Sequence, residues 1–146
     1  MSEGLAVSLR LVDDTLPVPS YQTEGAVAFD VYSRVEMEIG PRSVGLIPTN
    51  LIIKVPDGYV LAVLPRSSTP KKKGLLIPHG FGVIDQDYHG SEDEILYQVY
   101  NFTDLPVPIG RGERVGQAMF LRCDRGTFVQ DLETKQSRGG FGSTGS

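Results

Sequence analysis

The sequence predicts an all-β fold, a sandwich or jelly roll built from short strands. Its 17 glycines and 10 prolines interrupt the chain so often that the longest stretch without either is Ser91–Leu105, which leaves little room for long helices. Between these interruptions lie short runs with the composition of strands. In the first run, Val7, Leu9 and Leu11 alternate with Ser8 and Arg10. A period of two is typical of a half-buried strand.

Six runs have the composition of strands, and the breaks between some of them have an expected structure. The expected strands span residues 6–12, 26–32, 50–55, 59–64, 95–101 and 114–121. Pro56-Asp57-Gly58 predicts a hairpin turn between two of these strands. One short helix is expected within Ser67–Leu76, where the strand pattern is interrupted. Residues 1–136 are then one β domain, and residues 137–146 are a flexible, glycine-rich arm.

Length and composition restrict the class of protein. A chain of 146 residues that is 40% hydrophobic and 22% charged is expected to fold as one soluble globular domain. Its net charge of −4 disfavours nucleic acid as a partner. The single Cys123 excludes an internal disulfide and a thiolate metal site. No apolar run approaches the roughly 20 residues that span a bilayer, and no signal peptide is evident, so we expect a cytoplasmic protein without a membrane partner.

Two segments carry side chains that suit phosphate and sugar chemistry. Pro65-Arg66-Ser67-Ser68 follows an apolar run and places donors for phosphate oxygens at the end of a strand, although the same pattern also occurs in surface turns. Gly82–Gly90 predicts a tight β-hairpin that carries Asp85 and Tyr88. Asp85 is a candidate general base toward water or acceptor for a sugar hydroxyl, and Tyr88 is a candidate to pack on a cyclic ligand. Alternatively, Asp85 and Asp87 only stabilise the turn.

Other polar residues give weaker indications. Gln117 lies in a strand that follows a turn, and its amide would face either a phosphate or solvent. Lys71, Lys72 and Lys73 form either part of an anion site or a solvated loop. The sequence contains no GxxxxGK[ST] phosphate loop, GxSxG elbow or HExxH helix.

Five segments, taken in order, resemble the five motifs of the trimeric deoxyuridine triphosphate nucleotidohydrolases, the dUTPases. Residues 28–31 (AFDV) resemble the first motif, A-G-Y-D-L, and residues 65–68 (PRSS) resemble the second, P-R-S-G. Residues 82–90 are similar to the third, G-V-I-D-x-D-Y-x-G. Residues 114–118 (RVGQA) match the fourth, R-x-A-Q-L, and residues 138–145 (RGGFGSTG) match the fifth, R-G-x-G-G-F-G-S-T-G.

The chain departs from these motifs in a few places. Ala28 and Ser68 stand where the family usually has glycine. Arg138 lies closer to Phe141 than in the commonest form of the fifth motif. The acidic segment 91–94 makes the connection after the third motif longer than in the family, and we expect it to be a solvated loop.

The resemblance implies a homotrimer of distorted jelly-roll barrels that cleaves dUTP to dUMP and pyrophosphate with Mg²⁺. This activity keeps uracil out of DNA and supplies dUMP for thymidylate synthesis. By the resemblance, Asp85 activates the water that attacks the α-phosphorus and also holds the deoxyribose 3′-hydroxyl. Tyr88 lies under the sugar and excludes a 2′-hydroxyl. Main-chain groups from Gly82, Val83 and Ile84 to Asp87 read the uracil edge.

The remaining motifs are implied to hold the phosphates and the metal. The phosphate ligands of the second and fourth motifs are Arg66, Ser67, Ser68 and Gln117. Asp30 contributes to the Mg²⁺ site through water. The arm closes over an active site that subunits share, where Phe141 stacks on the uracil. The other arm residues, which engage the distal phosphates, are Arg138, Gly142, Ser143 and Thr144.

Two rival functions remain open at the level of sequence. The related dCTP deaminases have a similar Arg-Ser-Ser signature and a catalytic glutamate just before a segment like Val99-Tyr100-Asn101, but this chain has Gln98 there. An amide cannot transfer protons as that glutamate does. The second rival is a non-catalytic nucleotide-binding regulator, against which the presence of Asp85 argues.

Overall fold

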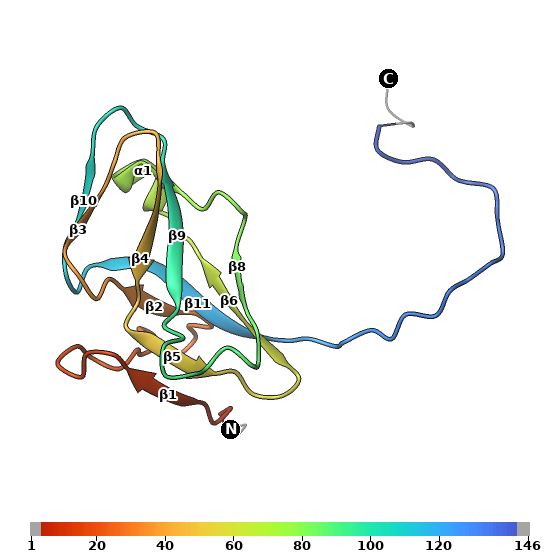
Figure 1. The fold of residues 1–146 in the computed structure, drawn as a ribbon, viewed down its shortest axis with the longest axis horizontal. Helices are drawn as coiled ribbons and strands as arrows, with labels where there is room; N and C mark the ends of the chain where they lie inside the picture. Colours follow the sequence, from red (N-terminus) through yellow and green to blue (C-terminus); the bar gives the residue numbers. More distant parts are fainter. Residues whose placement is uncertain (1–3, 143–146) are drawn as a thin grey trace.

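The computed structural model describes residues 4–142, which form eleven strands and one short helix (Figure 1). The strands make four small antiparallel sheets. Two sheets are pairs, namely β1 (Ser8–Leu11) with β5 (Leu51–Lys54), and β3 (Met37–Ile39) with β10 (Val107–Ile109). The third contains β4 (Val44–Pro48), β9 (Leu96–Asn101) and β7 (Leu75–Leu76) in that order. The fourth contains β2 (Phe29–Tyr32), β11 (Arg114–Arg122), β6 (Tyr59–Leu64) and β8 (Gly82–Ile84) in that order.

The expected all-β, jelly-roll-like fold is confirmed, and each of the six expected strands is present. Four further strands, β3, β4, β7 and β10, were not expected from the sequence. They are two to five residues long. Strands of two or three residues show too few alternations to be recognised in a sequence, and in the five-residue β4 Gly45 and Pro48 interrupt the strand composition.

The predicted hairpin at Pro56-Asp57-Gly58 is wrong, although a turn is present. The amide of Tyr59 donates to the carbonyl of Pro56 at 3.1 Å, and Gly58 has φ 80°. However, β5 pairs with β1, whereas β6 pairs with β11 and β8. The reason is that Leu51, Ile52 and Ile53 are all buried. A strand covered on both faces lies between layers and is not the outer half of a hairpin.

Gly82–Gly90 likewise does not form a self-contained hairpin. Its first three residues are β8, whose partner is β6, with Gly82 opposite Val63 and Ile84 opposite Leu61. The rest is a turn, in which the amide of Tyr88 donates to the carbonyl of Asp85 at 3.4 Å. β6 has a free edge at this position, and pairing with it satisfies more main-chain groups than a short local hairpin would.

The barrel core is apolar and closely packed around β9. Tyr97 and Val99 are fully buried in it. The ring of Tyr97 lies against Gly116 of β11, where a Cβ would be 2.8 Å from two ring atoms and 3.0 Å from the carbonyl oxygen of Leu64. Asn101, also fully buried, donates from its amide to the carbonyls of Ile39, Gly40 and Leu105 at 3.1, 3.0 and 2.8 Å.

The expected short helix is α1 (Thr69–Lys73), directly after the Pro65–Ser68 segment. Pro70 is in its first turn, where the missing N–H costs no hydrogen bond. The helix ends at Gly74, whose φ of 69° is the left-handed conformation that glycine tolerates best. This helix is neither long nor apolar enough to cross a membrane, and the same holds throughout residues 4–142.

The chain leaves the barrel after β11. Residues 123–142 follow an extended path away from the sheets (Figure 1). Within this segment, here called the tail, the large apolar side chains are almost fully exposed: Phe128 is 99%, Val129 86% and Leu132 80% exposed.

Candidate active site

Three of the candidate site residues meet at the end of β6. Gln117, in the middle of β11, lies opposite Asp30 of β2 on one side and opposite Leu64 of β6 on the other. Asp30 forms ion pairs with two arginines. Its Oδ1 lies 3.3 Å from Nε of Arg66, and its Oδ2 lies 3.3 Å from a terminal nitrogen of Arg114. The carboxylate thus holds both guanidinium groups beside the strand end.

The Pro65–Ser68 segment is fixed to this cluster by further hydrogen bonds. The Gln117 amide donates to the carbonyl of Pro65 at 2.9 Å, and the Arg66 amide donates to the hydroxyl of Thr69 at 3.1 Å. Ser68 is half-buried and Ser67 is exposed. The structure therefore brings Arg66 and Gln117 together, and Ser67 and Ser68 follow Arg66 in the same segment.

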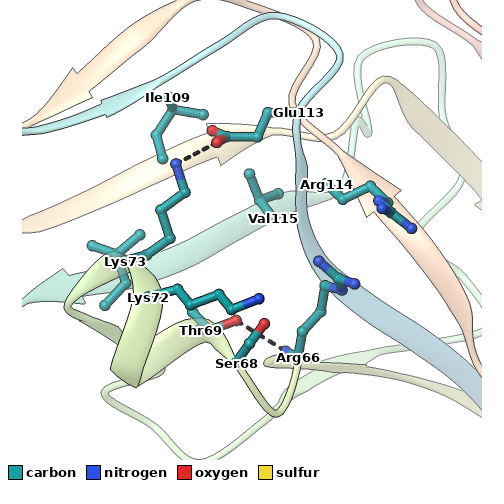
Figure 2. A pocket seen from close by; sticks show the side chains of 10 residues that line it. Arg66, Ser68, Thr69, Lys72, Lys73, Ile109, Glu113, Arg114 and Val115 are labelled. Atoms are coloured by element: carbon teal, nitrogen blue, oxygen red, sulfur yellow. Dashed lines mark hydrogen bonds and ion pairs between the residues drawn. The ribbon is translucent and has the colours of Figure 1, made fainter.

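A hollow of about 250 Å³ lies between this cluster and α1 (Figure 2). Arg66, Arg114, Lys72 and Lys73 line it, together with a single carboxylate, that of Glu113, which pairs with Lys73. The hollow, together with the Asp30 carboxylate that pairs with Arg66 and Arg114, is here called the cationic pocket. Clustered guanidinium and ammonium groups favour a polyanion such as a phosphate chain. Arg114 was not among the predicted ligands, although the arginine of the fourth motif was a signal for it.

One mode of divalent-ion binding fits the residues of the cationic pocket. No group of three or more His, Cys, Asp or Glu side chains that could bind a metal occurs within residues 4–142. Asp30 offers one carboxylate, and both of its oxygens already face arginines. Mg²⁺ commonly keeps several waters and binds one carboxylate together with substrate phosphates. Asp30 fits this mode, through water.

The candidate base and sugar residues lie elsewhere in the same chain. Continuing the register of β8 beyond Ile84 puts Asp85 level with Val60 of β6. Val60 is four residues before Leu64, where the cationic pocket begins. At about 3.3 Å per residue this separation is about 13 Å along the strand. One chain therefore does not bring Asp85 to its own cationic pocket.

Tyr88 is held by the segment that follows it. Its hydroxyl donates to the main-chain carbonyl of Glu94 at 3.0 Å. Glu94 in turn accepts two hydrogen bonds from Arg34, at 2.8 and 3.0 Å, and one from the amide of Asn50 at 2.8 Å. The hydrogen bonds to Glu94 raise the pKa of Arg34, whereas burial by itself would lower it. The network therefore depends on hydrogen bonds to a charged acceptor.

The acidic segment 91–94 is therefore not simply a solvated loop, as expected from its composition. Ser91 and Glu92 are exposed, but Asp93 accepts a hydrogen bond from the amide of Gly90 at 2.7 Å. The side chain of Glu94 is only 14% exposed. The acidic composition of the segment predicted that it would be exposed to solvent. Instead, Glu94 pairs with Arg34, sixty residues earlier in the sequence, and this pair fixes the conformation of the segment.

The tail does not reach the cationic pocket of its own chain in this structure. It runs away from the barrel (Figure 1), and the predicted arm ligands Arg138, Phe141 and Gly142 belong to its last five described residues, 138–142. Phe141 is fully exposed, with φ 50°. Ser143 and Thr144, the other two candidate ligands of the arm, lie outside the described residues.

Comparison with known proteins shows the family of this chain. The family model of the dUTPases matches residues 14–145. The deoxyuridine 5′-triphosphate nucleotidohydrolase of Dictyoglomus turgidum is 37% identical, over 97% of this chain and 99% of that protein. The enzyme of the same name from Lactococcus lactis is 35% identical, over 97% of each chain.

Solved structures give the same result. The dUTPase of Streptococcus mutans superimposes with a TM-score of 0.73 at 32% identity, over 84% of this chain and 98% of that one. A mutant dUTPase of phage phi11 of S. aureus has the same fold, with a TM-score of 0.79 at 20% identity, over 88% of this chain and 98% of that one. From its sequence motifs, its fold and these matches, the chain belongs to the dUTPase family.

Proposed function

We propose that this protein hydrolyses dUTP to dUMP and pyrophosphate. The observation that carries the proposal is the cationic pocket, in which Asp30 holds Arg66 and Arg114 beside the Gln117 strand. Such a pocket suits the triphosphate chain. The names of the relatives, which are nucleotidohydrolases of deoxyuridine triphosphate, support the identity of the nucleotide.

In the proposed reaction, Asp85 acts as the general base. Its carboxylate takes a proton from water, and the water oxygen forms a bond to the α-phosphorus while the bond from that phosphorus to the α–β bridging oxygen breaks. Pyrophosphate leaves with that oxygen, and dUMP remains. Asp85 is exposed on the turn after β8, where a water molecule can reach it.

The cationic pocket stabilises the charge that develops in this step. Arg66, Gln117 and the serines of the second motif donate to phosphate oxygens. Mg²⁺ supplies further charge neutralisation when it is held through water by Asp30 and by the phosphates. The Tyr88 ring packs under the deoxyribose and excludes a 2′-hydroxyl.

We also propose that the active protein is a homotrimer with shared sites. Two observations support it. The first is the separation of about 13 Å along β6 between the level of Asp85 and the cationic pocket of the same chain. In a trimer with shared sites, Asp85 of one subunit would lie beside the cationic pocket of its neighbour. The second is the tail, whose exposed Phe128, Val129 and Leu132 would be costly to leave in water and are suited to packing on another copy.

The proposal is tested by mixing the purified protein with dUTP and Mg²⁺ and measuring pyrophosphate and dUMP. We expect equal amounts of both, and less product from UTP or dTTP. Binding of dUTP without pyrophosphate would instead favour a regulator. Removal of Mg²⁺ with a chelator should reduce the rate.

The deaminase alternative is tested in the same assay by supplying dCTP and measuring ammonia. We expect none, because Gln98 cannot transfer protons. Gln98→Glu should not create the activity either, since deamination needs more than one carboxylate. Ammonia from the unmodified protein would favour the deaminase over the proposed function.

A further inference from the structure

A small recess lies between β8 and β9. It is lined by Gly82 and Ile84 of β8, by Gln98 of β9 and by His79 in the connection before β8. Its volume is about 20 Å³, room for about one water molecule. Along β9, Tyr97 and Val99 point into the core, and Gln98 between them faces the other way because strand side chains alternate.

Glycine at position 82 keeps this recess open. A Cβ on Gly82 would lie 3.3 Å from Cβ of Val63 and 3.8 Å from Nε2 of His79. The imidazole of His79 therefore lies over the main chain of Gly82. This main chain is the outer edge of its sheet, because β8 pairs with β6 and with no other strand in the described part of the chain.

The amide of Gln98 has no hydrogen-bond partner within residues 4–142. The other two half-buried glutamines of this part of the chain both have one: Gln86 donates to the carbonyl of Tyr59 at 3.1 Å, and Gln117 to that of Pro65 at 2.9 Å. The side chain of His79 is likewise without a partner among these residues. Two unpaired polar side chains beside an open strand edge are suited to a planar ligand with polar groups on its rim.

We propose that Gln98, with His79 beside it, reads the substituent at C4 of the pyrimidine base. This inference rests on the proposed function, which assigns the base to the main chain of Gly82–Ile84. Main-chain groups at the strand edge have a fixed direction, whereas a side-chain amide in the recess can reach one further atom. The NH₂ group of Gln98 donates to the C4 carbonyl of uracil, and cytosine has a donor, an amino group, at the same place.

The sharpest test is Gln98→Glu, because the carboxylate has almost the same shape but only accepts hydrogen bonds. It repels the uracil carbonyl and accepts from the cytosine amino group. The kcat/KM for dUTP should fall about tenfold or more, and the ratio of kcat/KM for dUTP to that for dCTP should fall by at least the same factor. Gln98→Met, which neither donates nor accepts well, should raise KM for dUTP by a smaller factor with kcat nearly unchanged.

Gln22→Glu is the control for the added charge, since Gln22 is an exposed glutamine in the connection before β2. It should leave the melting temperature and the dUTP:dCTP ratio nearly unchanged. A folded, active Gln98→Glu enzyme with the wild-type ratio would overturn the inference and leave the proposed function standing. Failure of the unmodified protein to hydrolyse dUTP would instead overturn the proposed function.

If Gln98→Glu does not fold, the inference is tested by NMR spectroscopy of the unmodified protein labelled with ¹⁵N. The side-chain amide signals of Gln98 are assigned by their absence from Gln98→Met. Addition of dUMP should shift them, and addition of dCMP should shift them less. Equal shifts, or none, would overturn the inference.

Discussion

The hydroxyl of Tyr88 donates to the main-chain carbonyl of Glu94, and the side-chain carboxylate of Glu94 accepts two hydrogen bonds from Arg34. The ring that is proposed to lie under the sugar is therefore attached to the barrel through the acidic segment. Tyr88→Phe keeps the ring and removes the attachment.

From this relationship we expect Tyr88→Phe to lose part of the selection against ribose. One hydrogen bond contributes about 0.5–1.5 kcal/mol, so the ratio of kcat/KM for dUTP to that for UTP should fall by about two- to tenfold. Tyr88→Ala should lose more, because it also removes the ring. Steady-state kinetics with both nucleotides measure the ratio, and an unchanged value in both variants would show that the sugar is read elsewhere.

Asp85→Asn should bind a non-hydrolysable dUTP analogue as the wild type does and turn over dUTP at least ~100-fold more slowly, the usual effect of losing a general base. The control is Asp87→Asn, two residues further along the same turn. It should retain most of the rate. Near-normal turnover by Asp85→Asn would remove this residue from the mechanism.

Shared sites predict that two inactive variants restore each other. Deletion of residues 138–146 should preserve folding and assembly, because the described part of this segment is mostly exposed, yet abolish most turnover. Mixed trimers of this deletion and Asp85→Asn, formed by unfolding and refolding together, should regain a measurable part of the rate. Trimers by sedimentation that regain no activity would indicate that each chain completes its own site.

Acid should weaken the fold through Asp13. The hydroxyl of Thr15 and then the guanidinium of Arg111 lower the pKa of Asp13 from 3.8 to about 2. Because the pKa is lower in the folded protein, the stabilisation is present above pH 4 and is lost as the pH falls toward 2. Asp13→Asn should therefore lose less stability than the wild type between pH 5 and about pH 2, as measured by urea unfolding.

Asp14→Asn is the control for that experiment. Asp14 makes no side-chain hydrogen bond or ion pair with the residues that the structure describes. It should show the same loss of stability in acid as the wild type. An Asp13→Asn protein that follows the wild-type curve would exclude Asp13 as a source of the acid sensitivity.

The sequence predicted β6 and β11 because each is a run with the composition of a strand. Pairing was harder to predict than strand position. Pro56–Gly58 has a good turn composition, but the strands on either side lie in different sheets, and the burial of Leu51–Ile53 that separates them is a property of the whole barrel.

Some residues of the candidate site could likewise be predicted from the sequence, and others could not. Asp30, Arg66 and Gln117 could be named from motifs, and the pairing of β2, β6 and β11 brings them together. The separation of Asp85 from them depends on the register of β8, which no local pattern encodes. Comparison with the deaminase signature named Gln98 only as a residue that cannot transfer protons, and its place beside His79 in the recess is visible only in the structure.

The contact between Gly116 and Tyr97 limits substitution at either position. Gly116→Ala places a methyl group 2.8 Å from the buried ring, so it should destabilise the protein by about 1–3 kcal/mol in urea unfolding. Gly116→Ala combined with Tyr97→Leu should be less destabilised than the sum of the two single variants, because the smaller side chain accommodates the methyl group. Additive effects would show that the ring simply moves aside.

This contact also has a consequence for how the two positions change during evolution. The fourth motif of the family usually has alanine where this chain has Gly116. Alanine at position 116 should destabilise a protein that has a large aromatic ring at position 97. A large ring at position 97 should likewise destabilise a protein that already has alanine at position 116. We therefore expect the two sites to covary among dUTPases, with glycine accompanying tyrosine and alanine accompanying a smaller residue. An alignment that showed the two varying independently would contradict this coupling.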